Sequence, residues 1–221
     1  MRRIILFSFI ILSFSSFHQK KTRVLFFGDS LTELGARPGG YIPRIDSLAR
    51  LENKSGQFEL MGSGISGNKV YDLYLRMEED VLSKDPDIVF IYVGINDIWH
   101  KVLLGTGTDP DKFEKFYAAI IKKLQDRKIK VILATPSLIG EKTDMTNQQD
   151  GELNSYGNIV RDLAKKNDLP LVDLRQKMME YLKDHNPQNK DRGILTYDRV
   201  HFIAAGNELI AEEFWKVLKR Q

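Results

Sequence analysis

The chain has 221 residues, of which 42% are hydrophobic and 29% are charged. This length and composition are typical of one globular domain with a sizeable core, and they exclude a disordered or coiled-coil chain. The chain contains no cysteine, which excludes disulfides, thiol catalysis, cysteine metal sites and lipid attachment to an N-terminal cysteine. The formal charge is +3, but removing the four basic residues among the first 21 leaves 29 basic and 30 acidic residues. Without a basic excess, no nucleic-acid partner is predicted.

The first 21 residues have the layout of a secretory signal peptide. Arg2 and Arg3 precede an apolar run at residues 4–12, and small residues follow around Ser15. The run is about half as long as a helix that crosses a bilayer, so no stable membrane span is expected after processing. The alternative is a buried first strand or helix. The sequence predicts a secreted or periplasmic protein whose mature domain spans residues 22–221, and it predicts no particular oligomeric state.

The rest of the chain alternates short apolar runs with amphipathic stretches, which is typical of an α/β protein with a parallel sheet. Strands are predicted at residues 24–27, 58–61, 88–93, 130–134 and 169–173. Helices are predicted at residues 41–51, 70–83, 113–127, 153–166 and 204–219. The third run, IVFIYV, is apolar without alternation, as expected for a central strand covered on both faces. Five strands with helical crossovers predict a three-layer α/β/α sandwich.

Two polar stretches, residues 103–111 and 140–151, lack the periodicity of a helix or strand and are predicted to be loops. They either flank a substrate cleft or simply connect elements at the surface.

Polar, glycine-rich turns follow the first three predicted strands. Residues 28–31 read GDSL, residues 62–68 read GSGISGN, and residues 94–97 read GIND. In open parallel sheets, function collects in the loops beyond the carboxyl ends of the strands. We therefore expect these three turns to share one edge of the sheet and to form a site there.

Ser30 lies in the tight turn between the first strand and the next helix, where a hydroxyl can be held clear of the sheet. A serine is a weak nucleophile unless a base takes its proton, so a histidine oriented by an acid is needed. Of the four histidines, His201 stands just before the last helix. Asp198 precedes it by three positions, a spacing at which a turn can bring the carboxylate to the imidazole. Taken singly, Asp-x-x-His is common by chance and Ser30 could merely cap a helix. Their joint occurrence favours a serine hydrolase.

With these residues the chain resembles the GDSL, or SGNH, hydrolase family, whose four named residues come from four separated sequence blocks. All four blocks are present in order, at residues 28–31, 64–68, 94–97 and 198–201. The resemblance covers almost the whole chain after the leader. It implies a flavodoxin-like sandwich with a five-stranded parallel sheet, in agreement with the predicted elements.

The resemblance also implies the roles of single residues. Ser30, Asp198 and His201 would form the catalytic triad, and the oxyanion would be held by N–H groups of Ser30, Gly67 and Asn96. Gly64 is the alternative glycine donor, because the residues before this block depart from the pattern of many relatives.

Two further acids, Asp29 and Asp97, are expected to support the active turn by hydrogen-bonding its backbone. Trp99 and His100 either line the cleft or are covered by the following loop. No metal and no organic cofactor is expected.

The predicted activity is hydrolysis of carboxylic esters through an acyl-serine, on a small-molecule or glycan substrate. Because the chain has no long apolar lid, short acyl groups such as acetyl on a carbohydrate are expected. A lysophospholipase or thioesterase acting on longer chains is one alternative, and a non-catalytic glycan-binding relative is another. A metal-dependent phosphoesterase would use Asp29, Asn96, Asp97, Asp198 and His201 as ligands, but it leaves Ser30 without a purpose.

Overall fold

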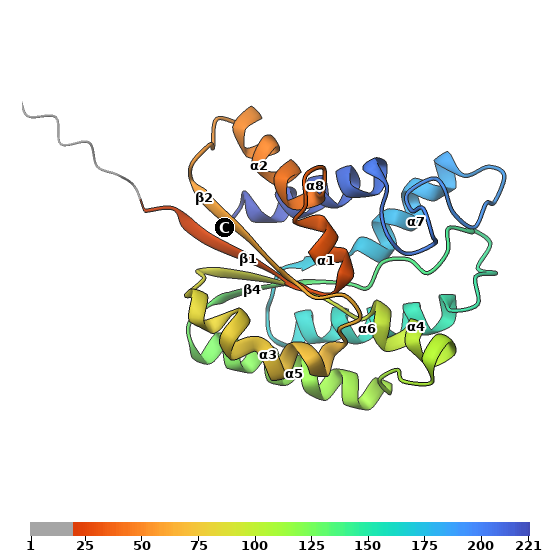
Figure 1. Cartoon of the computed structure of the whole chain (residues 1–221), viewed down its shortest axis with the longest axis horizontal. Helices are drawn as coiled ribbons and strands as arrows, with labels where there is room; N and C mark the ends of the chain where they lie inside the picture. The colour runs from red at the N-terminus through yellow and green to blue at the C-terminus, as the bar shows by residue number, and fades with distance from the viewer. Residues whose placement is uncertain (1–19) are drawn as a thin grey trace, which may run out of the picture.

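The computed structural model describes residues 20–221 (Figure 1). The predicted signal peptide lies outside these residues, apart from Lys20 and Lys21. Within them, none of the helices combines the length and the hydropathy that a membrane span requires.

A five-stranded, all-parallel sheet forms the middle layer. Its strands are β1 (Thr22–Gly28), β2 (Phe58–Gly64), β3 (Ile88–Tyr92), β4 (Lys130–Ala134) and β5 (Leu171–Val172). The strand order is β2-β1-β3-β4-β5, the doubly wound order of flavodoxin-like folds. Every residue of β3 is buried, which explains why that strand is apolar without alternation.

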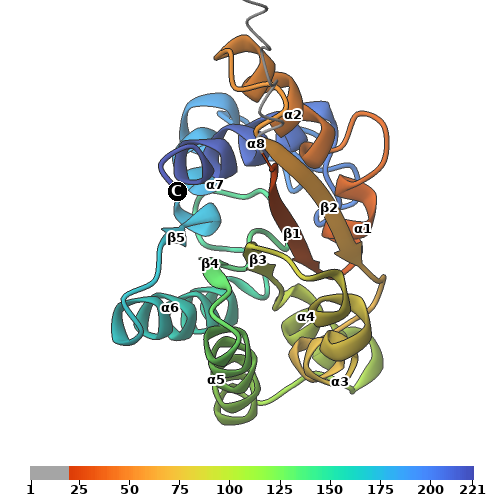
Figure 2. The same ribbon diagram turned by 90° about the vertical axis from the view of Figure 1, so that its left-hand side faces the viewer.

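Helices cover both faces of the sheet (Figures 1 and 2). One layer holds α1 (Ser30–Gly35), α2 (Tyr41–Leu51), α7 (Leu174–His185) and α8 (Ala204–Leu218). The other holds α3 (Val70–Asp80), the short 3-10 helix η1 (Leu82–Lys84), α4 (Ile95–Leu104), α5 (Pro110–Asp126) and α6 (Asp150–Lys166). The predicted three-layer α/β/α sandwich is confirmed.

Aromatic side chains join the middle of the sheet to the layer that contains α8. The ring of Phe26 on β1 stacks on Phe90 of β3 at 4.8 Å between centroids and on Phe214 of α8 at 5.7 Å. Tyr41 of α2 meets both Phe26 and Phe214 edge to face. Such pairs contribute about 0.5–1.5 kcal/mol each beyond the burial of their area. They fix β1, and therefore the turn that follows it, against two helices.

The prediction of a loop at residues 103–111 was wrong at both ends. Helix α4 continues to Leu104, and α5 begins at Pro110 after the N-cap Asp109. Proline is well accepted in the first turn of a helix, where its missing N–H has no partner to lose. The loop predicted at residues 140–151 ends at residue 149 in the structure, because α6 begins at Asp150.

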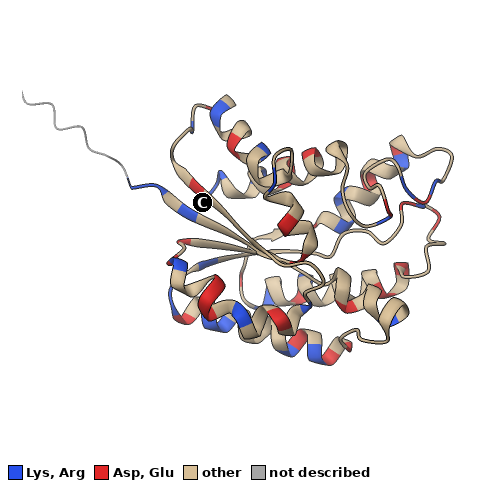
Figure 3. Cartoon of the chain, viewed as in Figure 1, with Lys and Arg blue, Asp and Glu red and all other residues tan. Residues whose placement is uncertain are grey.

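Charged side chains of both signs are interspersed along the outer helices (Figure 3). Many are paired one helical turn apart, such as Arg50 with Asp46 and Lys122 with Asp126. Exposed pairs of this kind contribute only about 0.3–0.5 kcal/mol each, so the stability of the fold rests mainly on its core.

Candidate active site

The turn that carries Ser30 is held tightly where β1 passes into α1 (Figure 1). Asp29 caps α1, and its Oδ1 accepts a hydrogen bond from the backbone N–H of Leu31 at 3.0 Å. A Cβ at Gly28 would lie 2.3 Å from Thr32 Oγ1 and 2.4 Å from the Tyr92 carbonyl oxygen, so this position requires glycine. Ser30 is therefore presented from a rigid turn at the carboxyl end of the sheet.

Ser30, His201 and Asp198 form a hydrogen-bonded relay. Ser30 Oγ lies 2.9 Å from His201 Nε2, and His201 Nδ1 lies 2.7 Å from Asp198 Oδ2. The second carboxylate oxygen, Asp198 Oδ1, accepts the backbone N–H groups of His201 at 2.7 Å and Val200 at 3.1 Å. A residue 171 positions away in sequence is thus within hydrogen-bond reach of the serine.

The pKa of Asp198 lies below its ordinary value. Partial burial raises the pKa, but the hydrogen bonds from the His201 side chain and from the backbone N–H groups of His201 and Val200 outweigh it. The carboxylate is therefore ionised at neutral pH, the state in which it can accept the Nδ1 proton of His201.

The segment that carries His201 is a short, tied loop. Thr196 and Phe202 form an antiparallel bridge across it, and the Tyr197 N–H donates to the His201 carbonyl at 2.9 Å. Arg199, at the tip, has a φ of +84°, which is uncommon for a residue with a side chain. The loop closes tightly enough to bring Asp198 back to the imidazole three residues later.

The two glycines of the second block have different surroundings. A Cβ on Gly64 would lie 2.1 Å from the backbone nitrogen of Glu33, so the close packing of β2 on α1 explains that glycine. Gly67 has a φ of +80°, and a Cβ there would be 3.8 Å from His100 Cε1. Gly64 has a structural reason to be glycine, and Gly67 is the residue whose conformation turns the loop.

Asn96 lies in the first turn of α4 and is 3% exposed. Its Nδ2 donates to the carbonyl of Asn68 at 3.0 Å, which orients the amide. The amide has a second N–H, so one hydrogen can fix the side chain while the other meets a ligand.

Asp97 and Asp29 are buried acids that flank this edge. Both oxygens of Asp97 lie 3.2 Å from the Val70 backbone nitrogen, so Asp97 ties α4 to the start of α3. Burial raises the pKa of Asp97 to about 6 and that of Asp29 to about 7.

Because the pKa of Asp29 is raised, we expect the pH dependence of stability to change in Asp29→Asn. The folded protein keeps a proton between pH 3.8 and about 7 that the unfolded chain releases, so this contribution to stability is full at low pH and lost as pH rises through that window. Asparagine still offers an oxygen to Leu31 but does not titrate. Relative to the variant, the wild type is expected to lose about 3 kcal/mol of unfolding free energy between pH 5 and pH 8. Urea unfolding of both proteins at the two pH values measures this. If the unfolding free energies of wild type and variant differ by the same amount at both pH values, the prediction is wrong.

Aromatic rings stand on two sides of His201. Tyr197 stacks on the imidazole with 5.8 Å between centroids and is 56% exposed, and Trp99 meets it edge to face at 6.3 Å. His100 is adjacent to Gly67, and burial and the charge of Lys69 lower its pKa. Trp99 thus lies beside the relay, and Tyr197 is an aromatic neighbour that the sequence did not single out.

Arg76, on α3, was also missed. Its Nη2 donates to the carbonyls of Gly28 at 2.7 Å and Ser63 at 3.1 Å, and its Nε donates to Asn68 Oδ1 at 2.7 Å. It also pairs with Asp80. One guanidinium therefore ties the turn before Ser30 to the loop that orients Asn96. The sequence offered no signal for this role, because Arg76 lies in no motif and is not part of the buried stripe of α3.

The acidic groups at this edge do not converge as metal ligands. Within residues 20–221, no group of three or more histidine, aspartate and glutamate side chains is arranged to hold a metal ion. The geometry supports proton transfer between Ser30 and His201.

Known proteins are similar to this chain over most of its length. The sequence model of the GDSL-like Lipase/Acylhydrolase family matches residues 26–209. A curated acetylxylan esterase of Geobacillus stearothermophilus is 31% identical over 208 residues, covering 87% of this chain and 91% of that protein.

Two solved structures are also similar. The acetyl xylan esterase AlAXEase is 55% identical with a TM-score of 0.87, and the match covers 89% of this chain and 99% of that one. Axe2, an acetylxylan esterase from Geobacillus stearothermophilus, is 29% identical with a TM-score of 0.77, over 88% and 93% of the two chains.

Proposed function

The chain belongs to the GDSL-like lipase/acylhydrolase family and is a carboxylic ester hydrolase, and we propose that it removes acetyl groups from xylan or xylo-oligosaccharides through Ser30. The observation that carries the proposal is the relay in which Ser30 Oγ lies 2.9 Å from His201 Nε2. The similar proteins supply the substrate class, because several of them are named for acetylxylan or acetyl-xylooligosaccharides.

The proposed roles match residue types replaced in a relative. Three solved structures are described as catalytic mutants of Axe2, in which a serine, an aspartate or a histidine is changed to alanine. In that enzyme the aspartate precedes the histidine by three positions, as Asp198 precedes His201. This supports Ser30, Asp198 and His201 as the triad.

In the first proposed step, His201 Nε2 takes the proton of Ser30 while Ser30 Oγ attacks the acetyl carbonyl. Asp198 holds the Nδ1–H of His201 and stabilises the imidazolium that forms. The tetrahedral oxyanion accepts hydrogen bonds from the N–H groups of Ser30 and Gly67 and from the Asn96 amide. Each such donor typically contributes about 2.7–4 kcal/mol to transition-state stabilisation.

Collapse of that intermediate breaks the bond to the sugar oxygen, which leaves with the proton from His201. Water then attacks the acetyl-serine, giving its proton to His201, and acetate is released as Ser30 recovers its hydrogen. Every proton moves between Ser30, His201 and the reactants, so no other residue has to donate or accept a proton.

The acyl specificity is tested with p-nitrophenyl esters from C2 to C12 and with acetylated xylo-oligosaccharides. We expect kcat/KM to be highest for C2 and acetate to be released from the oligosaccharides. Peak activity at C8 or longer would instead indicate a lysophospholipase or thioesterase, and no hydrolysis of any ester would leave the glycan-binding alternative.

Tyr197 is expected to contact the sugar rather than the acetyl group, because its exposed ring covers one side of His201. Tyr197→Ala keeps the backbone bond to His201 and removes only the ring. We expect KM for acetylated xylo-oligosaccharides to rise about threefold to tenfold, from the loss of one aromatic contact. The kcat/KM for p-nitrophenyl acetate should change far less. Tyr181→Ala, on α7, controls for the loss of an aromatic ring away from His201. If Tyr197→Ala affects both substrates equally, Tyr197 makes no sugar contact.

We also propose that the protein is secreted or periplasmic. The support is the layout of residues 1–21, with its paired arginines and short apolar run. N-terminal sequencing of the mature protein is expected to give a first residue near Thr22, with the apolar run at residues 4–12 removed. Recovery of the active enzyme only in the cytosol, with residues 1–21 intact, would overturn this.

A further inference from the structure

Glu141 is a buried carboxylate that makes no contact with the proposed triad itself. It lies between β4 and α6 and is 0% exposed. Its Oε2 accepts the Ile194 N–H at 2.8 Å. Its Oε1 accepts the N–H groups of Leu195 and Thr196 and the Thr196 hydroxyl, which lies at 2.6 Å. In residues 20–221 no lysine or arginine forms an ion pair with it, so backbone N–H groups and one hydroxyl satisfy the whole charge.

A buried carboxylate is costly unless it is fully hydrogen-bonded, and hydrogen bonds to a charged acceptor are stronger than neutral ones. Four donors from three consecutive residues converge on Glu141. The carboxylate therefore fixes the backbone of residues 194–196 in one conformation.

The segment that carries Glu141, residues 140–151, is joined by its backbone to the loop that carries His201. Gly140 donates its N–H to the Arg199 carbonyl at 2.8 Å, and the Glu141 N–H donates to the Asp191 carbonyl at 3.0 Å. The Glu141 carbonyl in turn accepts from Asn186 Nδ2 at 2.9 Å. Residues 140–141 thus bind the loop on both sides of Asp198.

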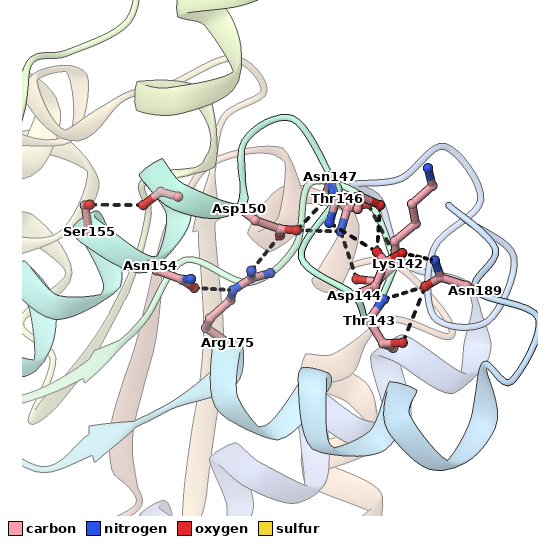
Figure 4. Close-up of polar contacts among 11 residues, drawn as sticks. Lys142, Thr143, Asp144, Thr146, Asn147, Asp150, Asn154, Ser155, Arg175 and Asn189 are labelled. Atoms are coloured by element: carbon pink, nitrogen blue, oxygen red, sulfur yellow. Dashed lines mark hydrogen bonds and ion pairs between the residues drawn. The ribbon is translucent and has the colours of Figure 1, made fainter.

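The rest of this segment is anchored elsewhere in the fold (Figure 4). Asn147 Nδ2 donates to the Lys142 carbonyl and to Asp150 Oδ2, both at 2.9 Å. Asp150 pairs with Arg175 at 2.6 Å, and both side chains are 3% exposed. Asn189 accepts the Thr143 N–H at 2.8 Å. The segment that carries Glu141 is therefore anchored to both α6 and α7.

Thr196 donates two of these hydrogen bonds, through its N–H and its hydroxyl. It is also the residue that pairs with Phe202, directly after His201. A displacement of residues 194–196 would move the pair that closes the loop. Displacing a catalytic group by about 1 Å can cost about 100-fold in rate.

We propose that Glu141 is a positioning residue for ester hydrolysis, which holds residues 194–196 so that His201 stays within hydrogen-bond distance of Ser30. The inference rests on the proposed function, because the reaction that it affects is acyl transfer to Ser30.

The test is Glu141→Gln, which keeps the shape but replaces one acceptor oxygen by an NH₂ group facing backbone N–H donors. We expect kcat for p-nitrophenyl acetate, per active site titrated with a serine-directed phosphonate, to fall about 10- to 100-fold, with KM nearly unchanged. In proton NMR spectra, the low-field signal of the His201 Nδ1–H should shift or broaden. Asp144→Asn is the matched control, since Asp144 lies exposed in the same segment and bonds only Thr146 and Asn189.

A lower melting temperature with an unchanged kcat and an unchanged NMR signal would overturn the proposal, because Glu141 would then be structural only. If Glu141→Gln does not fold, Thr196→Val removes a single donor, and the proposal requires that kcat still falls, by about threefold to tenfold. An unchanged kcat in that variant overturns it too. If the wild type hydrolyses no acetyl ester, the proposed function fails, while the NMR comparison still tests whether Glu141 positions His201.

Discussion

Replacing Ser30 by alanine is expected to lower kcat by about 10⁵- to 10⁶-fold, the loss seen when a serine hydrolase loses its nucleophile. The physical reason is that Ser30 Oγ is the atom 2.9 Å from His201 Nε2, and alanine leaves the base with no proton to take. KM should change little, since one hydroxyl contributes little to holding the sugar. The residual rate would come from the oxyanion donors and from binding alone.

The measurement is acetate release from acetylated xylo-oligosaccharides together with p-nitrophenyl acetate turnover. Ser155→Ala is the matched control, because Ser155 is exposed on α6 and bonds only the Gly151 carbonyl of its own helix (Figure 4). Far-UV circular dichroism should be the same for all three proteins. A Ser30→Ala rate within about tenfold of the wild type would rule out the acyl-serine mechanism.

The fold was predictable where apolar runs are long or strictly patterned. All five strands occur, although β5 has two residues where five were expected. Helix α4 was not predicted. Its first turn buries two polar residues, Asn96 and Asp97, at the candidate site, and they break the pattern of buried apolar and exposed polar residues that a helix is expected to show. Helix α7 was not predicted either, although it buries Leu174, Met178 and Leu182 at four-residue spacing and this periodicity is present in the sequence.

The residues of the candidate site also fall into those that the sequence could predict and those that it could not. Ser30 and His201 could be predicted because each lies in a short motif next to a strand end or a helix start. Arg76 and Glu141 have no such motif, since they bind backbone groups of segments that are distant in the sequence, Gly28 for Arg76 and residues 194–196 for Glu141. Glu141 reads as one polar residue in a loop until the fold places residues 194–196 against it. Such side chains can be found only after the chain is folded.

Asp198→Asn is expected to lower kcat by about 10⁴-fold while leaving the fold intact, because the change acts on the tautomer of His201. In the wild type, Asp198 Oδ1 already accepts the backbone N–H groups of Val200 and His201, and Oδ2 faces Nδ1. An asparagine must keep its oxygen on those N–H groups, so its NH₂ turns toward Nδ1. The ring must then carry its proton on Nε2, the nitrogen that should accept the proton of Ser30.

The tautomer of His201 sets an order of activity between two variants. Asp198→Ala removes the carboxylate but imposes no tautomer on His201, so a fraction of the rings keeps Nε2 free. We therefore expect Asp198→Asn to be no more active than Asp198→Ala, although asparagine resembles aspartate more closely in shape. Asp184→Asn, exposed on α7, controls for the loss of one charge. Measured kcat values at pH 8 test this order. If the asparagine variant is the faster of the two, Asp198 acts on His201 through its charge alone and not by fixing the tautomer.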